Sequence, residues 1–551
     1  MFAYSYENLK KLTQTEKGKE YIQEFKDFYE KNYKDKPVYS MSFSEYKLFY
    51  SEGDRKTYET SFFYRRARFS VLQVLAISDD SYIDELEEII FAICDEYSWI
   101  VPAHAYLKLE LFSAETARML AETDYIFGDR LSSIIRARIK ESIHRKVIQV
   151  YENNTFWWDK TDCNWAAVCG CGVGLAYLYL YPERFEAIKE RLFDTFKSFL
   201  SGFDEQGFCY EGVNYWQYGF SSFCTFFDIY EKLGNGRPDF IDEDKVKKVI
   251  RYVHNARMSE DIYLPFADGG YPTWQMDANS AYAIKLLYPN DFEFNKMSEF
   301  LPSHAGFGLH SLYGVTTFDD KNEFLQKDES IYYKKTQVFI RKRPNYSFAV
   351  QCGNNGIIHN HNDVGAFQIV KNNKRVVCDF GAGLYTKEYF GTDEQRYKIF
   401  ACNSLGHSVP IVDGELQMYG AQYHGEIISQ SENEIIMDIA KAYKNAPKSL
   451  KVHYCTEADR VGVKYHVKGI KEKISFHFVS DLEPIVEEKG LRIGTVLLTC
   501  DLMTKPFITH RKEFPHNPSR SKEGEQARDV YLIDYEICGK SEVTAEFIFN
   551  L

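Results

Sequence analysis

Two imidazoles, two amides and a carboxylate stand together in the run His359-Asn360-His361-Asn362-Asp363. Because side chains alternate along an extended backbone, His359 and His361 are expected to project to the same side. Imidazole is the usual proton carrier near neutral pH and a frequent metal ligand. Packing alone does not require such a cluster, so the run predicts a site of chemistry.

A possible metal site combines this run with two later residues. Asp379 closes a predicted strand, and His407 lies in a tight turn. With His361 they offer one carboxylate and two imidazoles, a set that zinc accepts at roughly 2.0–2.2 Å, with water or a further group completing the tetrahedron. Their spacing matches no local zinc motif. The alternative is that both histidines are hydrogen-bonded loop residues and Asp379 is a turn residue.

Two stretches of the first half place polar or aromatic side chains where helices are expected to begin. Asp162 is a candidate N-cap, so Asn164 would lie in the first helical turn, from which its amide can face a cavity. Tyr215 and Tyr218 lie three residues apart and share one face of an aromatic helix. The alternatives are a capping or loop amide for Asn164 and core positions for both tyrosines.

The elements that must position these residues differ between the two halves of the chain. In the first half, apolar residues recur every three or four positions and predict paired helices. Helices are expected at 62–76, 82–97, 110–124, 132–151, 165–180, 185–200, 216–233, 243–257 and 279–287. Later runs are short, β-branched and separated by turn residues. Strands are expected at 330–334, 337–341, 347–352, 365–370, 375–379, 426–429, 434–439, 460–467, 474–479, 495–502 and 530–537.

These patterns predict an α+β chain of two domains. Paired helices without a repeat of fixed period favour an incomplete (α/α) toroid over a regular solenoid. Short strands without long helices between them predict an antiparallel β-sandwich. We expect the toroid over residues 1–305 and the sandwich over residues 306–551.

Composition restricts the class of partner. The chain has 67 Lys and Arg against 80 Asp and Glu, so an acidic chain without basic runs argues against nucleic acid. Its aromatic fraction of 16% suits a large core and also a surface that stacks on sugar rings. The sequence shows no signal-peptide core or membrane span, and its 12 cysteines are scattered, so we expect a cytoplasmic protein with reduced thiols. A homo-oligomer is compatible with the sequence.

Together these segments resemble the heparinase II/III-like superfamily of polysaccharide lyases over most of the chain. In the first half the resemblance rests on 91–97, Trp99, 102–104, Asn164-Trp165-x-Ala-Val and Glu211-Gly-x-x-Tyr215-Trp-x-Tyr218-Gly. In the second half it rests on His359-Asn-His361-Asn-Asp363-x-Gly, Asp379-x-Gly-x-Gly-x-Tyr385 and Asn403-Ser-x-Gly-His407. The resemblance implies a toroid joined to a β-sandwich, with the active site between them.

The resemblance also implies β-elimination at a uronic acid, which leaves a 4,5-unsaturated uronate. The C5 proton lies beside a carboxylate that must be neutralised or hydrogen-bonded while a base takes the proton and an acid protonates the leaving oxygen. Asn164 is similar to the family's carboxylate-binding Asn, Tyr215 to its catalytic Tyr and His359 to its catalytic His. A phenol has a pKa near ~10. Tyr215 is therefore expected as the acid, and also as the base if elimination is syn. His359 would be the opposing base or the group that neutralises the carboxylate.

The same resemblance implies a metal and further contacts with an acidic oligo- or polysaccharide. It places a structural zinc ion on His361, Asp379 and His407, where the ion would brace the loop that carries His359. Substrate contacts are implied for Trp165, Tyr218, Tyr385 and Arg396.

Two departures and two alternatives accompany the resemblance. Ala166 and Cys163 stand where the family often has asparagine, which affects details of the sugar subsites. The lack of a secretion signal suggests imported oligosaccharides and exo-action.

A glycoside hydrolase on the same toroid would need two carboxylates, for which Glu211 and Asp268 are the candidates, although the local sequence around Asp268 predicts a simple turn. A glycan-binding protein of the same fold without turnover is the other alternative.

Overall fold

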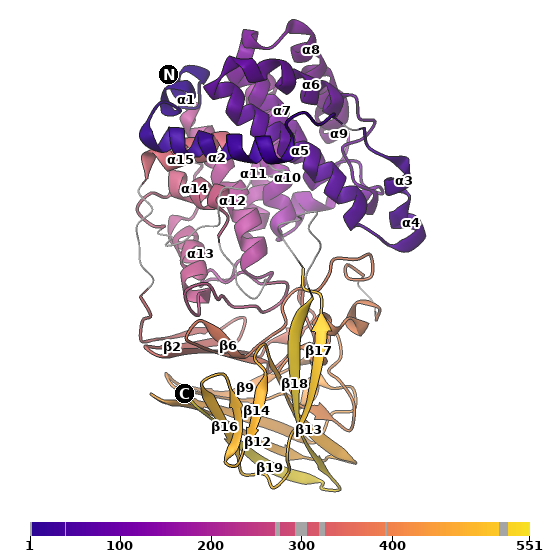
Figure 1. Cartoon of the computed structure of the whole chain (residues 1–551), viewed down its shortest axis with the longest axis vertical. Helices are drawn as coiled ribbons and strands as arrows, with labels where there is room; N and C mark the ends of the chain where they lie inside the picture. The colour runs from indigo at the N-terminus through magenta and orange to yellow at the C-terminus, as the bar shows by residue number, and fades with distance from the viewer. Residues whose placement is uncertain are drawn as a thin grey trace. The chain divides into compact units, whose positions relative to one another are not determined.

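The computed structural model describes residues 3–38, 40–269, 276–292, 306–318, 325–391, 394–516 and 527–551. The chain divides into two compact units (Figure 1). The helical unit comprises Met1–Phe203, Tyr215–Lys247 and Gln275–Glu323. The sandwich unit comprises Asp204–Asn214, Lys248–Trp274 and Phe324–Leu551. Two segments of the first half, around Glu211 and Asp268, therefore belong to the unit that holds the strands.

The helices confirm the predicted helical first half and begin earlier in the chain than expected. Their bounds are α1 (Tyr6–Leu12), α2 (Glu16–Asn32), α3 (Phe43–Tyr46), α4 (Leu48–Glu52), α5 (Lys56–Ser78), α6 (Ile83–Cys94), α7 (Leu111–Phe127), α8 (Ser133–Ile143), α9 (Gln149–Glu152), α10 (Asn164–Leu180), α11 (Pro182–Ser201), α12 (Val213–Lys232), α13 (Glu243–Ala256), α14 (Ala278–Leu287) and α15 (Gly308–Thr317). The last of these, α15, lies in the helical unit although its residues come after the boundary expected at 305.

Helix α10 forms part of the centre of the helical unit, where it packs against α7 and α11. Nearly every residue of α10 is buried, because the helix is apolar on all sides. A Cβ on Gly172 would lie 2.5 Å from the carbonyl carbon of Ala114 in α7, so only glycine lets the two helices approach this closely. Helices packed in this way form the predicted incomplete α/α toroid.

The strands of the sandwich unit are antiparallel, as predicted. Their bounds are β1 (Glu329–Tyr333), β2 (Val338–Arg343), β3 (Tyr346–Gln351), β4 (Asn354–Asn355), β5 (Phe367–Lys371), β6 (Lys374–Val377), β7 (Ile411–Val412), β8 (Gly420–His424), β9 (Glu426–Gln430), β10 (Glu434–Asp438), β11 (Ser449–Thr456), β12 (Arg460–Lys468), β13 (Lys473–Ser480), β14 (Pro484–Glu487), β15 (Gly490–Ile493), β16 (Val496–Cys500), β17 (Phe507–Glu513), β18 (Arg528–Cys538) and β19 (Glu542–Asn550). The sheet orders are β1-β2-β3-β5-β6, β14-β15-β16-β19-β12-β11-β10-β9, β17-β18-β13-β7 and β4-β8.

Aromatic side chains join the sheets into one core. Phe348 of β3 contacts Tyr454 of β11 with ring centroids 5.6 Å apart, and Phe478 of β13 contacts Phe547 of β19 at 4.9 Å. Along β12 buried and solvent-facing residues alternate strictly, which fixes the register because a slip of one residue would turn the apolar face outward. The segments between β3 and β7 are attached to this core, and they contain His359, His361, Asp379 and His407.

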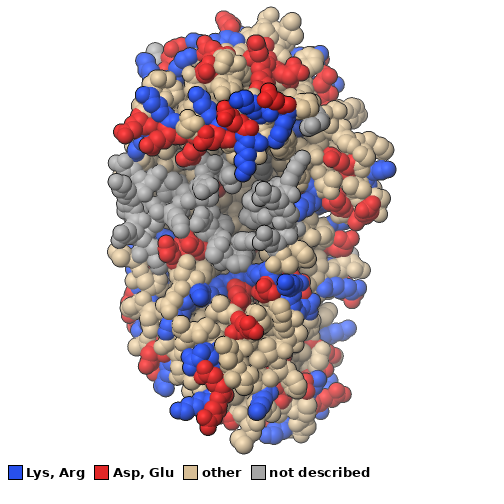
Figure 2. Space-filling view, viewed as in Figure 1, with Lys and Arg blue, Asp and Glu red and all other residues tan. Residues whose placement is uncertain are grey.

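Lys and Arg side chains are interspersed with Asp and Glu over the visible face of the protein (Figure 2). All twelve cysteines are free thiols, as expected from their scattered positions. In the described part of the chain, every helix is too short or too polar to span a lipid bilayer.

Candidate functional site

His359 occupies a turn that holds its backbone in an unusual conformation. Its φ angle is 60°, in the left-handed region that non-glycine residues rarely adopt, and not the extended conformation expected from the sequence. The imidazole is 15% exposed, and its Nδ1 lies 2.6 Å from Oδ2 of Asp268. Its Nε2 lies 3.5 Å from Oε1 of Glu211. When Nδ1–H donates to Asp268, Nε2 is the nitrogen that can take or give a proton.

Asp268 links His359 to several other side chains of the sandwich unit. Its carboxylate is fully buried, and its Oδ1 lies 3.1 Å from Nε2 of His361 and 3.5 Å from a guanidinium nitrogen of Arg396. The Tyr389 hydroxyl also donates to Oδ1. His359 and His361 therefore each contact one oxygen of the Asp268 carboxylate, although the backbone of His359 is not extended.

The charges around Asp268 keep it ionised. Burial by itself would raise the pKa of its carboxyl group, but the charge of Arg396 and the hydrogen bonds from His359 and His361 outweigh burial and hold the pKa well below its usual range. Burial lowers the pKa of His361, which favours a neutral imidazole. A neutral His361 that donates Nε2–H to Asp268 has its lone pair on Nδ1.

Glycine allows the Glu211 and Asp268 segments to approach each other. Gly212 has a φ angle of 87°, and a Cβ on it would collide with the backbone of Gly269. The preceding Ala267 has a φ angle of 58°, so the Asp268 turn also passes through the left-handed region. The sequence indicated turns at both places, but their contact joins segments more than fifty residues apart.

Arg396 braces this cluster from inside the protein. One guanidinium nitrogen donates to the backbone oxygen of Tyr389, and the other donates to that of Asn360 at 3.2 Å. The side chain is only 7% exposed. Arg396 thus holds the His359 turn and balances the charge of Asp268, whereas its predicted contact with substrate stays a prediction.

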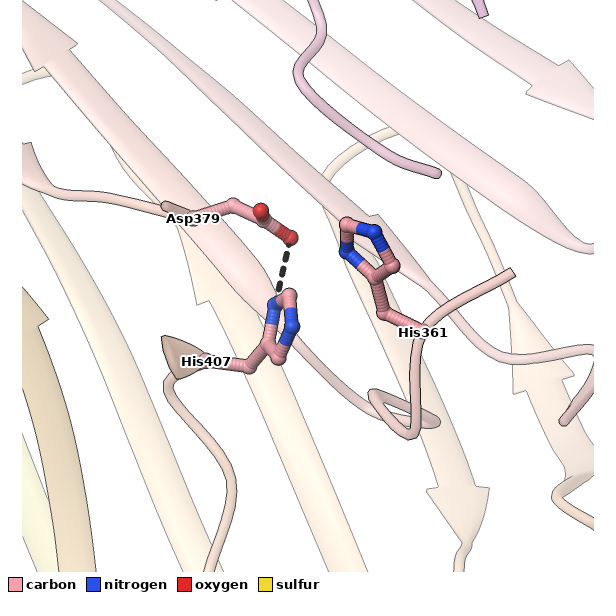
Figure 3. A group of neighbouring side chains, drawn as sticks. All are labelled: His361, Asp379 and His407. Carbon is pink, nitrogen blue, oxygen red and sulfur yellow. Dashed lines mark hydrogen bonds and ion pairs between the residues drawn. The ribbon is translucent and has the colours of Figure 1, made fainter. Parts of the chain in front are cut away.

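The three predicted metal ligands lie together in the sandwich unit (Figure 3). Buried ligand atoms of His361, Asp379 and His407 all lie within 4.8 Å of one another. Nδ1 of His407 is 2.8 Å from Oδ2 of Asp379, and the imidazoles of His361 and His407 have centroids 5.1 Å apart. Figure 3 shows the His361 ring turned toward the other two side chains.

In both histidines, the ring nitrogen that points away from the other ligands has a hydrogen-bond partner. Nε2 of His407 donates to the backbone oxygen of Ala401 at 3.0 Å, and Nε2 of His361 faces Asp268, so each ring presents Nδ1 inward. Metal-bound histidines usually have such a partner on the outer nitrogen. Nδ1 of His361 is buried without a hydrogen-bond partner among the described residues. An unpaired buried nitrogen facing a carboxylate and a second imidazole fits a divalent cation.

Burial and neighbouring charges shift the pKa values of two groups in this cluster. Burial by itself would lower the pKa of His407, but Asp379 outweighs it and raises the pKa to about 9. Burial raises the pKa of Asp363, which follows His361 by two residues, to about 7. Deprotonation of this cluster would accompany metal binding, because both imidazoles must then offer a lone pair.

In the helical unit, Asn164 and Tyr215 belong to two helices in close contact. Asn164 is the first residue of α10 and is buried, with Cys163 and not Asp162 at the N-cap. A Cβ on Gly219 of α12 would lie 3.1 Å from both Cα and Cβ of Asn164. Tyr215 precedes Gly219 by one helical turn on the same helix face. The absence of a side chain at Gly219 therefore lets the Tyr215 face of α12 pack against the start of α10.

The other predicted substrate-binding residues of the helical unit lie beside these two. Tyr218 donates its hydroxyl to Oε1 of Glu115 at 2.8 Å. Trp165 packs between His104 and Trp157, with ring centroids 5.1 and 5.0 Å away. Trp157 is 49% exposed, so this aromatic row reaches solvent beside Asn164. Trp157 was not predicted as a site residue, although the Trp157-Trp158 pair is visible in the sequence.

Tyr385 belongs to an aromatic cluster of the sandwich unit. Its ring stacks on His516 with centroids 3.7 Å apart and contacts Tyr389 at 5.0 Å and Phe390 at 4.8 Å. Phe390 also contacts the His359 ring at 6.3 Å. Tyr385 is therefore two aromatic contacts away from His359.

Solved structures of polysaccharide lyases share this fold along nearly the whole chain. Heparinase III matches with a TM-score of 0.62 at 11% identity, over 96% of this chain and 91% of its own. The chain has the fold of the heparinase-like lyases. Heparan sulfate lyase HepC from Pedobacter heparinus matches at 0.56 and 10% identity, over 96% and 87% of the two chains. Chondroitin AC lyase of Streptomyces coelicolor A3, solved with chondroitin sulphate, matches at 0.59 and 9%, over 99% and 82%.

No protein-family profile and no curated protein sequence matches the chain. The solved structures confirm the predicted heparinase-like resemblance at the level of the fold. Besides Trp157, three residues contact this site without having been predicted for the lyase site from the sequence: Asp268, Tyr389 and Asp363. Each contacts a predicted site residue. Asp363 lies in the motif of His359 and His361, and Asp268 was named from the sequence only as a turn residue and as a carboxylate of the hydrolase alternative.

Proposed function

We propose that the protein is a polysaccharide or oligosaccharide lyase that cleaves uronic-acid-containing glycans by β-elimination. The observation that carries the proposal is the His359 imidazole, which the buried carboxylate of Asp268 orients through Nδ1 in a strained turn, with Nε2 3.5 Å from Glu211. The heparinase-like fold supports the reaction class, since two of the solved structures named above are a heparan sulfate lyase and a chondroitin AC lyase.

His359 is assigned to proton transfer or charge neutralisation at the uronate. Asp268 fixes the ring tautomer through Nδ1, in the way that a carboxylate orients a catalytic imidazole in hydrolases. Nε2 then acts as base toward the C5 proton, or holds a proton that neutralises the substrate carboxylate. Glu211, 3.5 Å from Nε2, stabilises the imidazolium that forms when Nε2 takes a proton.

Asn164 and Tyr215 are assigned to the sugar carboxylate and to the leaving oxygen. An amide at the start of a helix can donate to a carboxylate as negative charge moves onto it, and the helix N-terminus favours the same charge. The phenol of Tyr215 supplies the proton that the leaving O4 needs, and also takes the C5 proton if elimination is syn. Trp165, Tyr218 and Tyr385 are proposed to contact the sugars, whereas we propose that Arg396 positions the His359 turn.

A divalent metal, which we propose to be zinc, would be held by His361, Asp379 and His407. The ion would supply a fixed positive charge that braces the turn between His359 and His361. Asp268 would transmit this bracing, because it accepts from His361 with one oxygen and from His359 with the other. The chemistry at the sugar is left to the chain's own side chains.

The burial of Asp268 argues against the hydrolase alternative. A glycosidase needs two carboxyl groups that reach the scissile bond from opposite sides. Asp268 has no exposed surface and is surrounded by four donor side chains, so it cannot protonate a glycosidic oxygen. Glu211 would be left as a single carboxyl group.

A panel of uronate oligosaccharides of heparan, chondroitin, hyaluronan and alginate type tests the proposal. Elimination produces ultraviolet absorbance from the new conjugated double bond, whereas hydrolysis produces reducing ends without it. We expect absorbance with at least one panel member and a loss of about 100-fold or more in kcat for His359→Ala and Tyr215→Phe. New reducing ends without absorbance would refute the lyase assignment.

Two surface substitutions serve as matched controls. His466 lies on β12 with 42% of its side chain exposed, so His466→Ala removes an imidazole far along the sequence from the site. Tyr97 is 96% exposed, so Tyr97→Phe removes a phenol hydroxyl without disturbing packing. Both controls should keep the wild-type kcat. Glycan binding with no product in the wild type, unchanged in His359→Ala, would instead indicate a binding protein without turnover.

A further inference from the structure

Asp363 is a buried carboxylate with an unused oxygen beside the candidate metal ligands. It follows His361 by two residues and is 5% exposed. Its Oδ2 lies 3.9 Å from Nδ1 of His407 and has no hydrogen-bond partner among the residues the structure describes. Buried carboxylate oxygens are normally paired, so this one requires an explanation.

The local charge balance favours a cation at this place. Asp363 and Asp379 both approach the same imidazole of His407, at 3.9 and 2.8 Å. Two carboxylates in a buried site are costly unless positive charge compensates them. One divalent ion with two neutral imidazoles and two carboxylates makes the site neutral.

We propose that Asp363 is the fourth ligand of the metal held by His361, Asp379 and His407. This inference rests on the metal site assigned under the proposed function. Asp363 lies outside the group of three whose ligand atoms are all within 4.8 Å of one another, so its carboxylate has to move toward them when metal binds. Its Oδ2 is 3.9 Å from Nδ1 of His407, whereas ligand atoms of a tetrahedral zinc site are about 3.4 Å apart. Four protein ligands close the shell, which makes the ion a structural brace without an open position for substrate.

Water is the competing fourth ligand, because a cavity adjoins the site. A cavity of about 40 Å³ is lined by both His361 and Asp363, together with Gln351, Asn354 and Asn360. Its volume is enough for an ordered water molecule. The two possibilities differ in whether metal binding depends on the charge of Asp363.

Metal affinity of the full chain distinguishes the two ligands. The wild type and Asp363→Asn are loaded with Zn²⁺, metal content is measured by elemental analysis, and affinity is measured by competition with a chelator. The amide keeps the shape of Asp363 but removes its charge, and we expect an affinity loss of about 100-fold or more, above the range typical of outer-sphere partners. Asp534→Asn removes another carboxylate that accepts from a histidine of the sandwich unit, His477, and should leave the affinity unchanged.

The absorption spectrum of the Co²⁺-loaded protein provides a readout that does not depend on turnover. A closed shell of four protein ligands predicts a tetrahedral spectrum in the wild type that changes in Asp363→Asn. Asp363→His, with the adjoining cavity as space for the ring, restores a ligand and should recover metal content even if Asp363→Asn folds poorly. Unchanged affinity and spectrum in Asp363→Asn would assign the fourth position to water and overturn the inference.

Failure of this inference can be separated from failure of the lyase assignment. A wild type that binds no Zn²⁺ would overturn both the fourth ligand and the metal site, whatever its activity. Absorbance from uronate oligosaccharides would be measured on the same preparation. A metal-loaded protein without this absorbance would refute the lyase assignment while leaving the role of Asp363 standing.

Discussion

Replacement of Asp268 by asparagine tests whether a buried carboxylate orients His359. The substitution keeps the shape of the side chain and removes its charge. Asparagine can donate a hydrogen to Nδ1 of His359, which would move the ring proton to Nε2 and abolish its capacity to act as base. Arg396 would at the same time lose the anion that lies 3.5 Å from its guanidinium group.

The contacts of Asp268 determine how much the substitution lowers the unfolding free energy and kcat. Removal of one partner of a buried ion pair costs about 3–5 kcal/mol of unfolding free energy, and Arg396 is 7% exposed. Loss of a correctly protonated base lowers kcat by about 10²–10⁴-fold. Asp268 is fully buried, so KM should change by less than about threefold, in line with loss of an interaction made only in the transition state.

The assay follows ultraviolet absorbance on the best uronate oligosaccharide, with activity normalised to folded protein. Asp481→Asn is the matched control for stability. Asp481 accepts from Nε of Arg375 at 2.6 Å and from Nε of Arg528 at 2.9 Å, in the same unit but without contact to His359. It should destabilise the protein by a comparable amount and keep kcat per folded molecule.

One result would refute the reasoning. If Asp268→Asn unfolds at a lower temperature, as Asp481→Asn does, but keeps kcat within about threefold of the wild type, Asp268 stabilises the unit without orienting the imidazole. His359 would then owe its position to the strained turn alone.

Three further perturbations test other parts of the molecule. Gly219→Ala should push Asn164 from its place, costing about 1–3 kcal/mol of stability and lowering kcat/KM at least tenfold, whereas Gly236→Ala, with nothing within 4 Å, should change neither. Trp157→Ala should raise KM about 5–10-fold at constant kcat, because the exposed ring is available to stack on a sugar. Burial raises the pKa of Glu122 to about 7, so the native state holds a proton that the unfolded chain releases near ~4.5. The unfolding free energy of the wild type relative to Glu122→Gln should therefore be highest below pH ~4.5 and fall by up to about 3 kcal/mol as the pH rises to 8.

The outcomes that would contradict these three predictions are specific. Unchanged kinetics in Gly219→Ala would separate Asn164 from the reaction. A fall in kcat without a rise in KM for Trp157→Ala would argue against a sugar contact. A pH-independent difference between wild type and Glu122→Gln in chemical denaturation would mean that Glu122 is ionised in the native state.

The sequence by itself determined the fold class and indicated several residues of the candidate site. The three-to-four residue periodicity of the first half and the short β-branched runs of the second are local patterns, and each reports which face of an element is buried. The histidines of the run 359–363, with Asp379 and His407, were recognisable from residue type and motif order, and the structure brings His361 together with the last two.

Tertiary structure alone decided how His359 is held. Its carboxylate partner Asp268 lies 91 residues earlier in the chain, in a segment that reads locally as a simple turn. Glycine packing at Gly212 brings Glu211 beside it, and no local pattern records which distant backbone a glycine will meet. Hydrogen bonds and ion pairs depend on distances set by the whole fold, whereas sequence patterns report only neighbours along one element. The sequence therefore identified the imidazoles, and the fold determined the carboxylate that joins them.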